Sequence, residues 1–279
     1  MIITLWGTRG SLPCSGPQNR KYGGNTSCVE VRGAEGTLLV LDAGTGIRPL
    51  GLAINDKIER VDILLTHLHL DHIQGLGFFL PLFNPNVEVH IYGPAYSEKH
   101  LRQQLSKYLS PPLFPVLLHD LPCNLYLHAV PRGEFKVGEF RIFSEIVCHP
   151  GLTVGYHLST SAGSLAYMPD HEPALGVKSF PNAAEWTSGY QVAANVDLLL
   201  HDAQYTKSEY AHRVGWGHST FQQALEFAKL AKVKKVVTFH HDPAHNDKEL
   251  DDLLAEAVKA ANPPFEVQPG LEGAIFELV

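Results

Sequence analysis

The 279-residue sequence lacks several features that would each indicate a particular class of protein. No window approaches eighteen consecutive apolar residues, and the segment from Met1 to Arg9 is not a cationic region followed by a long apolar stretch. Lys and Arg form no dense run, and the formal net charge is −7. Because affinity for nucleic acids depends largely on neutralisation of phosphates by these residues, a general DNA or RNA partner is not expected. We therefore expect a cytoplasmic protein with neither a membrane partner nor a nucleic-acid partner.

Signals for disulfides and for several domains are also missing. The four cysteines include no Cys-x-x-Cys pair, which in a chain of this length is typical of reduced thiols. No repeat or low-complexity linker divides the sequence, and 44% hydrophobic residues suffice for one large core. We expect one domain over residues 1–279, with a surface insertion near residues 94–125 where Pro111, Pro112 and Pro115 interrupt a helix. Such an insertion would form a lid or a simple ornament.

The most informative motif present is His67-Leu68-His69-Leu70-Asp71-His72, which directly follows the strand-like residues 61–65. Four such donors would be costly to bury unless a cation organised them, and imidazole plus carboxylate suits zinc, iron or manganese. The spacing divides the donors, because His67 and His69 project to one side of an extended loop while Asp71 and His72 begin the next turn. One segment can therefore serve two ions. The alternative interpretation is a set of surface histidines without a metal.

The remaining elements predict a layered α/β fold. The first 65 residues resemble a β-meander, later strands are separated by Gly and Pro, and the clearest helices come late in the chain. The predicted strands are 2–6, 27–32, 37–42, 62–65, 87–92, 139–148, 153–158, 164–168, 196–200 and 236–239, and the predicted helices are 97–109, 220–232 and 247–260. Two sheets inside and helices outside fit this order of elements.

Further metal donors follow other predicted strands, at the position where loops of a rigid scaffold converge. Four strands end in a His or Asp: the donors are His149; Asp170 with His171; His201 with Asp202; and His240 with His241. Any one of these alone is weak, because a terminal His or Asp often only caps a loop. Four such donor segments, each directly after a predicted strand, together with the motif from His67 to His72, indicate a shared site.

With these motifs in place, the chain resembles the metallo-β-lactamase superfamily, whose hallmark is the HxHxDH motif followed by single His, Asp and His ligands at strand ends. The resemblance covers nearly the whole chain and implies an αββα sandwich of two mixed β-sheets flanked by helices. Four segments are similar to the branch that contains ribonuclease Z and the phosphoribosyl cyclic phosphodiesterases: WGTRGS (6–11), YGGNTS (22–27), LDAGTG (41–46) and GWGHST (215–220).

This resemblance also implies the ligands of two divalent ions. It assigns His67, His69 and His149 to one ion, Asp71, His72 and His240 to the other, and Asp170 to a bridging position. We prefer His240 to His241 because His240 directly follows its strand. Zinc is the expected metal, with manganese or iron as the alternatives.

Two such ions, about 3.5 to 4 Å apart, would share a bridging hydroxide and clamp the reacting oxygens. Two carboxylates and one hydroxide leave the pair with one net positive charge, which suits a phosphodiester monoanion but also tolerates an ester or lactone.

The expected catalytic residues are Asp71, His218 and Asp202. His218 would protonate the leaving alkoxide, and Asp202 would orient its imidazole and raise its pKa. The alternative for His218 is a residue at the start of a helix with no catalytic part. The alternative for Asp202 is direct metal ligation in place of Asp170. Asp42 is either an acceptor for a ligand histidine or an Asx turn, and Arg9 and Arg213 either meet a phosphate or are solvated.

The favoured function is therefore a dinuclear metal-dependent hydrolase, a phosphodiesterase whose partner is a small or cyclic phosphodiester substrate. A thioester or lactone hydrolase is the alternative, and a non-catalytic scaffold would not need every ligand. An RNA-processing nuclease is disfavoured, because the tRNA-binding arm of ribonuclease Z lies between the third histidine and the bridging aspartate, and His149 and Asp170 are close together here. The sequence leaves a homodimer open.

Overall fold

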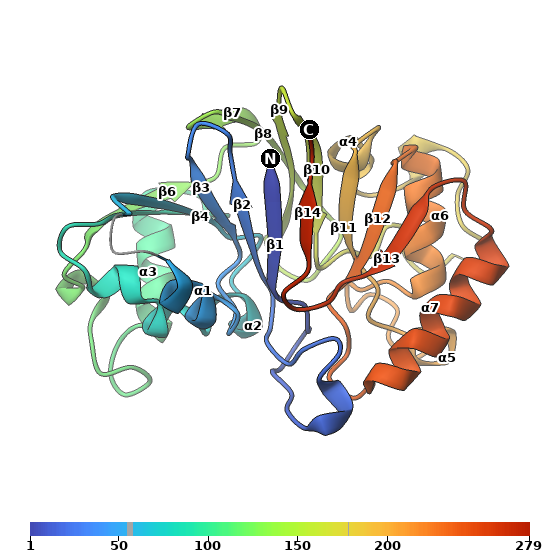
Figure 1. The fold of residues 1–279 in the computed structure, drawn as a ribbon, viewed down its shortest axis with the longest axis horizontal. Coiled ribbons are helices and arrows are strands. Elements are labelled where there is room, and N and C mark those ends of the chain that lie inside the picture. Colours follow the sequence, from blue (N-terminus) through green and yellow to red (C-terminus); the bar gives the residue numbers. More distant parts are fainter. Residues whose placement is uncertain (55–57, 178) are drawn as a thin grey trace.

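The computed structural model of the protein describes residues 1–54, 58–177 and 179–279. Two seven-stranded β-sheets form the centre of the molecule, and helices cover their two outer faces (Figure 1). The expected αββα sandwich of two mixed sheets is confirmed.

The first sheet has the strand order β14-β1-β2-β3-β4-β5-β6. Its strands are β1 (Ile2–Gly7), β2 (Cys28–Arg32), β3 (Leu38–Leu41), β4 (Arg60–Leu64), β5 (Glu88–Gly93), β6 (Asn124–Ala129) and β14 (Ile275–Glu277). Pairing is antiparallel from β14 to β3 and parallel from β3 to β6.

The second sheet has the strand order β13-β12-β11-β10-β9-β8-β7. Its strands are β7 (Gly133–Val137), β8 (Phe140–Ile146), β9 (Val154–Thr160), β10 (Gly163–Met168), β11 (Leu198–Asp202), β12 (Lys235–Phe239) and β13 (Glu266–Pro269). Strands β10 to β13 are parallel, and β7 to β10 are antiparallel. Because β8, β10, β11 and β12 run in one direction, their carboxyl ends meet at one edge of the sheet.

Helices α1 and α3 lie on the side of the first sheet and α4, α6 and α7 on the side of the second sheet, whereas the short helix α2 lies at the lower end of the sandwich (Figure 1). The α-helices are α1 (Ile47–Ala53), α2 (Leu70–Ile73), α3 (Glu98–Tyr108), α4 (Tyr190–Ala193), α5 (Lys207–Tyr210), α6 (Phe221–Ala231) and α7 (Asp247–Ala261). Short 3-10 turns are η1 (Pro17–Asn19), η2 (Leu76–Phe78), η3 (Leu80–Phe83), η4 (Leu118–Asp120) and η5 (Ala184–Trp186). Capping boxes at Thr220 and Asn246 start α6 and α7, because each side chain accepts a hydrogen bond from an otherwise unpaired backbone N–H.

The interior is apolar between the sheets and beneath both helical layers. Leu39, Leu41, Tyr156, Leu158 and Phe239 are fully buried in the layer between the sheets. Burying one such side chain stabilises the fold by about 1.5–3 kcal/mol, so this layer fixes the position of the strand ends that carry the site.

The expected β-meander at the start of the chain is only partly correct. Strands β1 to β3 are antiparallel neighbours, but β3 and β4 are parallel and helix α1 connects them. This short helix was not predicted, because Pro49 and Gly51 have low helix propensity and interrupt its apolar pattern. The segment with the predicted insertion, 94–125, contains α3 and η4, and Leu101 and Leu105 of α3 pack into the core. In the described part of the chain, no helix combines the length and the apolar character that crossing a membrane requires.

Candidate functional site

The predicted donors gather at one end of the sandwich, where strands of both sheets terminate. The loop after β4 carries His67 and His69, helix α2 carries Asp71 and His72, and the loops after β8 and β10 carry His149 and Asp170. Asp202 ends β11, and His240 follows β12. Residues that are distant in the sequence therefore meet because their strands end at the same edge.

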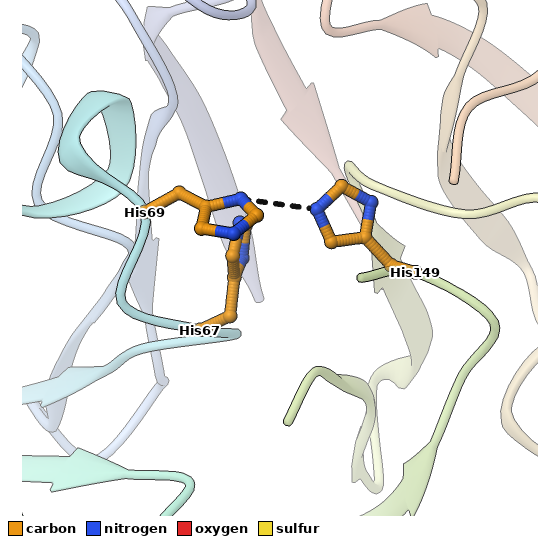
Figure 2. Close-up of side chains that lie close together, drawn as sticks. All are labelled: His67, His69 and His149. Atoms are coloured by element: carbon orange, nitrogen blue, oxygen red, sulfur yellow. Dashed lines mark hydrogen bonds between the residues drawn. The ribbon is translucent and has the colours of Figure 1, made fainter. Parts of the chain in front are cut away.

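The first group of donors consists of His67, His69 and His149, whose ligand atoms all lie within 4.8 Å of one another. Figure 2 shows that His67 and His69 come from one loop and that His149 faces them from another. His149 Nε2 lies 3.1 Å from His69 Nδ1. Burial lowers the pKa of all three imidazoles, which favours the neutral form that binds metal ions.

The second group consists of Asp71, His72 and His240. Asp71 Oδ2 lies 3.3 Å from His72 Nε2 and 3.2 Å from His240 Nε2. The neighbouring His241 is not part of the group, because its ring packs against Tyr22 and Phe221. The preference for His240 over His241 thus agrees with where the two rings lie.

Asp170 lies between the two groups and offers one oxygen to each. Its Oδ1 is 3.8 Å from His67 Nε2 and 3.7 Å from His149 Nε2. Its Oδ2 is 3.0 Å from His72 Nε2 and 3.4 Å from His240 Nε2. Burial alone would raise the pKa of Asp170, but the surrounding imidazoles hold it well below the usual range. A carboxylate in this position suits a bridge between two cations.

The donor set fits divalent metal ions on further grounds. His67 Nε2 is buried and has no hydrogen-bond partner among the described residues, although a buried imidazole nitrogen normally has one. In three of the imidazoles Nδ1, the ring nitrogen that faces away from the donor group, has a hydrogen-bond partner. His72 Nδ1 lies 2.8 Å from Asp42 Oδ2, His240 Nδ1 lies 2.8 Å from Gln204 Oε1, and His149 Nδ1 lies 3.0 Å from the Gly217 carbonyl. Such partners fix the ring orientation of metal-binding histidines.

Among these supporting residues, only Asp42 is a candidate from the sequence. It accepts hydrogen bonds from the Thr66 backbone N–H and from the Tyr167 hydroxyl in addition to facing His72. Gln204 carries no sequence signal, and Gly217 is visible only as part of the family-like segment 215–220, because the roles of both depend on contacts between distant strands. Gly217 is required by space as well: its φ is +85°, and a Cβ there would lie 2.3 Å from His149 Nδ1.

His218 and Asp202 form a pair beside the two groups. His218 Nδ1 lies 2.7 Å from Asp202 Oδ2, and Asp202 Oδ1 accepts hydrogen bonds from the backbone N–H groups of Ser219 and Gln204. Burial would lower the pKa of His218, but the Asp202 carboxylate raises it above its usual value. His218 Nε2 is thus the nitrogen that remains available for a substrate. The carboxylate of Asp202 is occupied by these three donors, which fits its role as the partner of His218 better than metal ligation in place of Asp170.

The loop that carries His218 is anchored by Glu172, which the sequence did not single out. This buried carboxylate accepts hydrogen bonds from the backbone N–H groups of Gly215 and Gly217 and from the Tyr210 hydroxyl. The carbonyl of Gly217 is in turn the hydrogen-bond partner of His149 Nδ1, and Gly217 directly precedes His218. Glu172 therefore positions one donor of the first group and the proposed proton donor together.

Replacing this anchor should damage the site without removing a donor. In Glu172→Gln the negative charge is lost and one carboxylate oxygen becomes an amide nitrogen that cannot accept. The remaining oxygen can keep either the two backbone N–H groups of Gly215 and Gly217 or the Tyr210 hydroxyl, so part of the anchor is lost and the bonds that remain are weaker. We expect the free energy of unfolding to fall by about 1–3 kcal/mol and hydrolysis to slow by about 10- to 100-fold. Denaturant unfolding and steady-state kinetics would measure both, with Glu185→Gln at an exposed carboxylate as the control. Unchanged unfolding and kinetics would show that the anchor contributes nothing.

The two candidate arginines differ. Arg9 is fully buried and donates hydrogen bonds to the carbonyls of Gly23, Asp242 and His245. Both predicted roles for Arg9, phosphate binding and surface solvation, are therefore wrong, and burial could not be read from its position beside Gly10. Arg213 is one-third exposed and lies on the His218 side of the site.

Comparison with known proteins places the chain among metallo-hydrolases. The sequence profile of the "Beta-lactamase superfamily domain" matches residues 37–241. A Ribonuclease Z of Thermococcus onnurineus is 25% identical and matches 99% of this chain and 94% of its own length. Among solved structures, the metallo-beta-lactamase fold protein YhfI of Bacillus subtilis has a TM-score of 0.71 at 19% identity, and the match covers 99% of this chain and 98% of YhfI. A diphosphatase from the PhnP family has a TM-score of 0.69 at 20% identity, covering 100% of this chain and 98% of its own.

Proposed function

The chain belongs to the beta-lactamase superfamily and is a hydrolase of the metallo-β-lactamase fold, and from this premise we propose that it is a dinuclear, zinc-dependent phosphodiesterase. Its substrate would be a small or cyclic phosphodiester. The observation that carries this proposal is the pair of His218 and Asp202, 2.7 Å apart, beside two donor groups that share Asp170.

The donor groups support a site for two ions. His67, His69 and His149 would hold one ion, Asp71, His72 and His240 would hold the other, and Asp170 would contact both. Neutral imidazoles and carboxylates in this number suit zinc, with manganese or iron as alternatives. When bound, such ions would polarise the phosphoryl oxygens and supply a nucleophile at neutral pH.

The remaining chemistry belongs to side chains of the chain itself. Cleavage of an unactivated phosphodiester expels an alkoxide, which benefits from a proton delivered as the P–O bond breaks. Asp202 accepts a hydrogen bond from the Nδ1–H of His218 and stabilises the imidazolium form, so that Nε2 can donate its proton to the leaving oxygen. General acids of this kind accelerate a reaction by about 10² to 10⁴. Hydrolysis of a thioester or lactone has no comparable need for this pair, which is why the phosphodiester is preferred.

The first test is a comparison of substrates. We expect bis(p-nitrophenyl) phosphate to be hydrolysed on the order of 100-fold faster than p-nitrophenyl phosphate, because a dianionic monoester fits a site for a monoanion poorly. Steady-state rates of the zinc-loaded protein would be measured on both, together with a thioester and a lactone as controls. Robust thioester or lactone turnover without diester hydrolysis would transfer the function to the alternative.

An RNA substrate is a second candidate, because the Thermococcus onnurineus relative is named Ribonuclease Z. The segment between His149 and Asp170 holds only the hairpin of β9 and β10, which leaves residues 161 and 162 as the connection. No RNA-binding arm is present at that point of the described chain. Cleavage of a tRNA precursor at its 3′ trailer, at a rate matching that on small diesters, would favour the nuclease.

A further inference from the structure

A row of side chains in contact with one another leads from His218 to the surface. The ring of Tyr205 meets the ring of His218 edge-on at 5.5 Å. The guanidinium of Arg213 lies over Tyr205, with Cζ 4.9 Å from the ring centroid, and its Cζ is 5.9 Å from the ring of Trp216. Tyr205 is buried, whereas Trp216 is 58% exposed, so the row begins at the proposed proton donor and ends in an open aromatic face.

This row is held rigidly. The Trp216 backbone N–H donates to the Arg213 carbonyl, and the Arg213 N–H donates to the Tyr210 carbonyl. Glu172 fixes the two glycines that flank Trp216. An exposed Trp on a well-fixed backbone loses little entropy when it binds a ligand.

Two observations indicate a ligand at this place. Arg213 Nη1 is buried, and no acceptor among the described residues forms a hydrogen bond with it; the nearest carboxylate, Glu209 Oε1, is 3.8 Å away. In addition, the exposed apolar side chains of Leu175 and Val214 adjoin the loop that carries Trp216: Val214 Cγ1 lies beside Gly176, and Leu175 Cδ1 lies beside Gly215. A guanidinium with a free N–H beside an aromatic face suits a planar group that carries an acceptor oxygen or nitrogen.

We propose that Arg213 and Trp216 form the subsite for the leaving group of the substrate, and that they select a planar, aromatic or heteroaromatic leaving group that bears a hydrogen-bond acceptor. This inference rests on the proposed phosphodiesterase function. His218 Nε2 must reach the oxygen that leaves phosphorus, so the rest of the leaving group extends toward the surface that flanks His218. The ring stacks on Trp216, and the exposed part of the Arg213 guanidinium donates to its acceptor.

The test compares leaving groups of similar acidity and different shape. Phenyl and hexafluoroisopropyl esters of methyl phosphate have leaving groups of comparable acidity, but only the phenyl group is planar, and a 3-acetylphenyl ester adds an acceptor. For the wild-type protein we expect kcat/KM to follow the order 3-acetylphenyl, phenyl, hexafluoroisopropyl. Trp216→Ala should lower kcat/KM for both aryl esters by about tenfold, mainly through KM, and leave the hexafluoroisopropyl ester unchanged.

Further variants separate the two residues. Trp216→Phe should restore most of the aryl preference, and Arg213→Gln should remove only the advantage of the acetyl group. Trp186→Ala serves as the matched control, because Trp186 is 78% exposed and stacks on neither Arg213 nor Tyr205. A preference for aryl esters that persists in Trp216→Ala, or equal losses on all three esters, would overturn the subsite alone. A wild-type protein that hydrolyses none of the three diesters would overturn the proposed function and the subsite with it.

Discussion

Substitution of the donors should remove divalent ions in two separate steps. The wild-type protein should bind about two ions per chain after reconstitution, and Asp71→Ala or His240→Ala should remove one of them, because both side chains belong to the second group. His149→Ala should remove the other ion. Asp170→Ala should weaken both, since Asp170 offers one oxygen to each group.

Each of these variants should lose hydrolytic activity by about 10³-fold or more, because both the nucleophile and the polarisation of the phosphate depend on the complete site. Elemental analysis and kinetics on one preparation would measure metal content and rate together. His119→Ala is the control, since that imidazole is exposed and, among the described residues, pairs only with Asp120. One bound ion that survives both Asp71→Ala and His240→Ala would exclude the dinuclear arrangement.

Removal of the proposed proton donor should produce a loss that depends on the leaving group. His218→Ala should retain its metal and hydrolyse an alkyl or ribosyl phosphodiester about 10² to 10⁴ times more slowly. A p-nitrophenyl diester should be affected much less, because its leaving group is stable without a proton. Asp202→Asn should act in the same direction, since the amide stabilises the His218 imidazolium less well.

The double variant tests whether the two residues act as one unit. His218→Ala combined with Asp202→Asn should be little slower than His218→Ala alone, because Asp202 acts through the imidazole. The readouts are metal content and rates on both classes of diester. Equal losses on activated and unactivated leaving groups would show that His218 positions the substrate, and loss of metal would show that it holds an ion.

Most strands of this fold could be predicted from the sequence, because apolar runs such as residues 61–65 are bounded by turn-forming residues. The prediction missed β6, β7, β13 and β14. The partners of the strands could not be predicted. The pairing of β3 with β4 is parallel because α1 turns the chain between them, and the sequence of that helix, IRPLGLA, has little helical character. Strand β14 pairs with β1 from the opposite end of the chain, and no local pattern indicates such a contact.

The candidate site divides in a similar way. The cluster from His67 to His72 is visible because its donors are consecutive, and His149, Asp170 and His240 are visible because each follows a strand. Whether these seven side chains ligate metal stays a prediction. Glu172 and Gln204 escaped notice because each supports a donor on another strand.

Because His67 and Asp71 follow a strand of the first sheet while His149 and His240 follow strands of the second, each donor group draws members from both halves of the sandwich. Neither half alone could retain either of the proposed ions. A motion that slid one sheet over the other would separate both ligand sets at once, so the bound ions would cross-link the two sheets. Catalytic competence would then report directly on the packing between the sheets, and a substitution deep in that interface could silence the enzyme without touching a single donor.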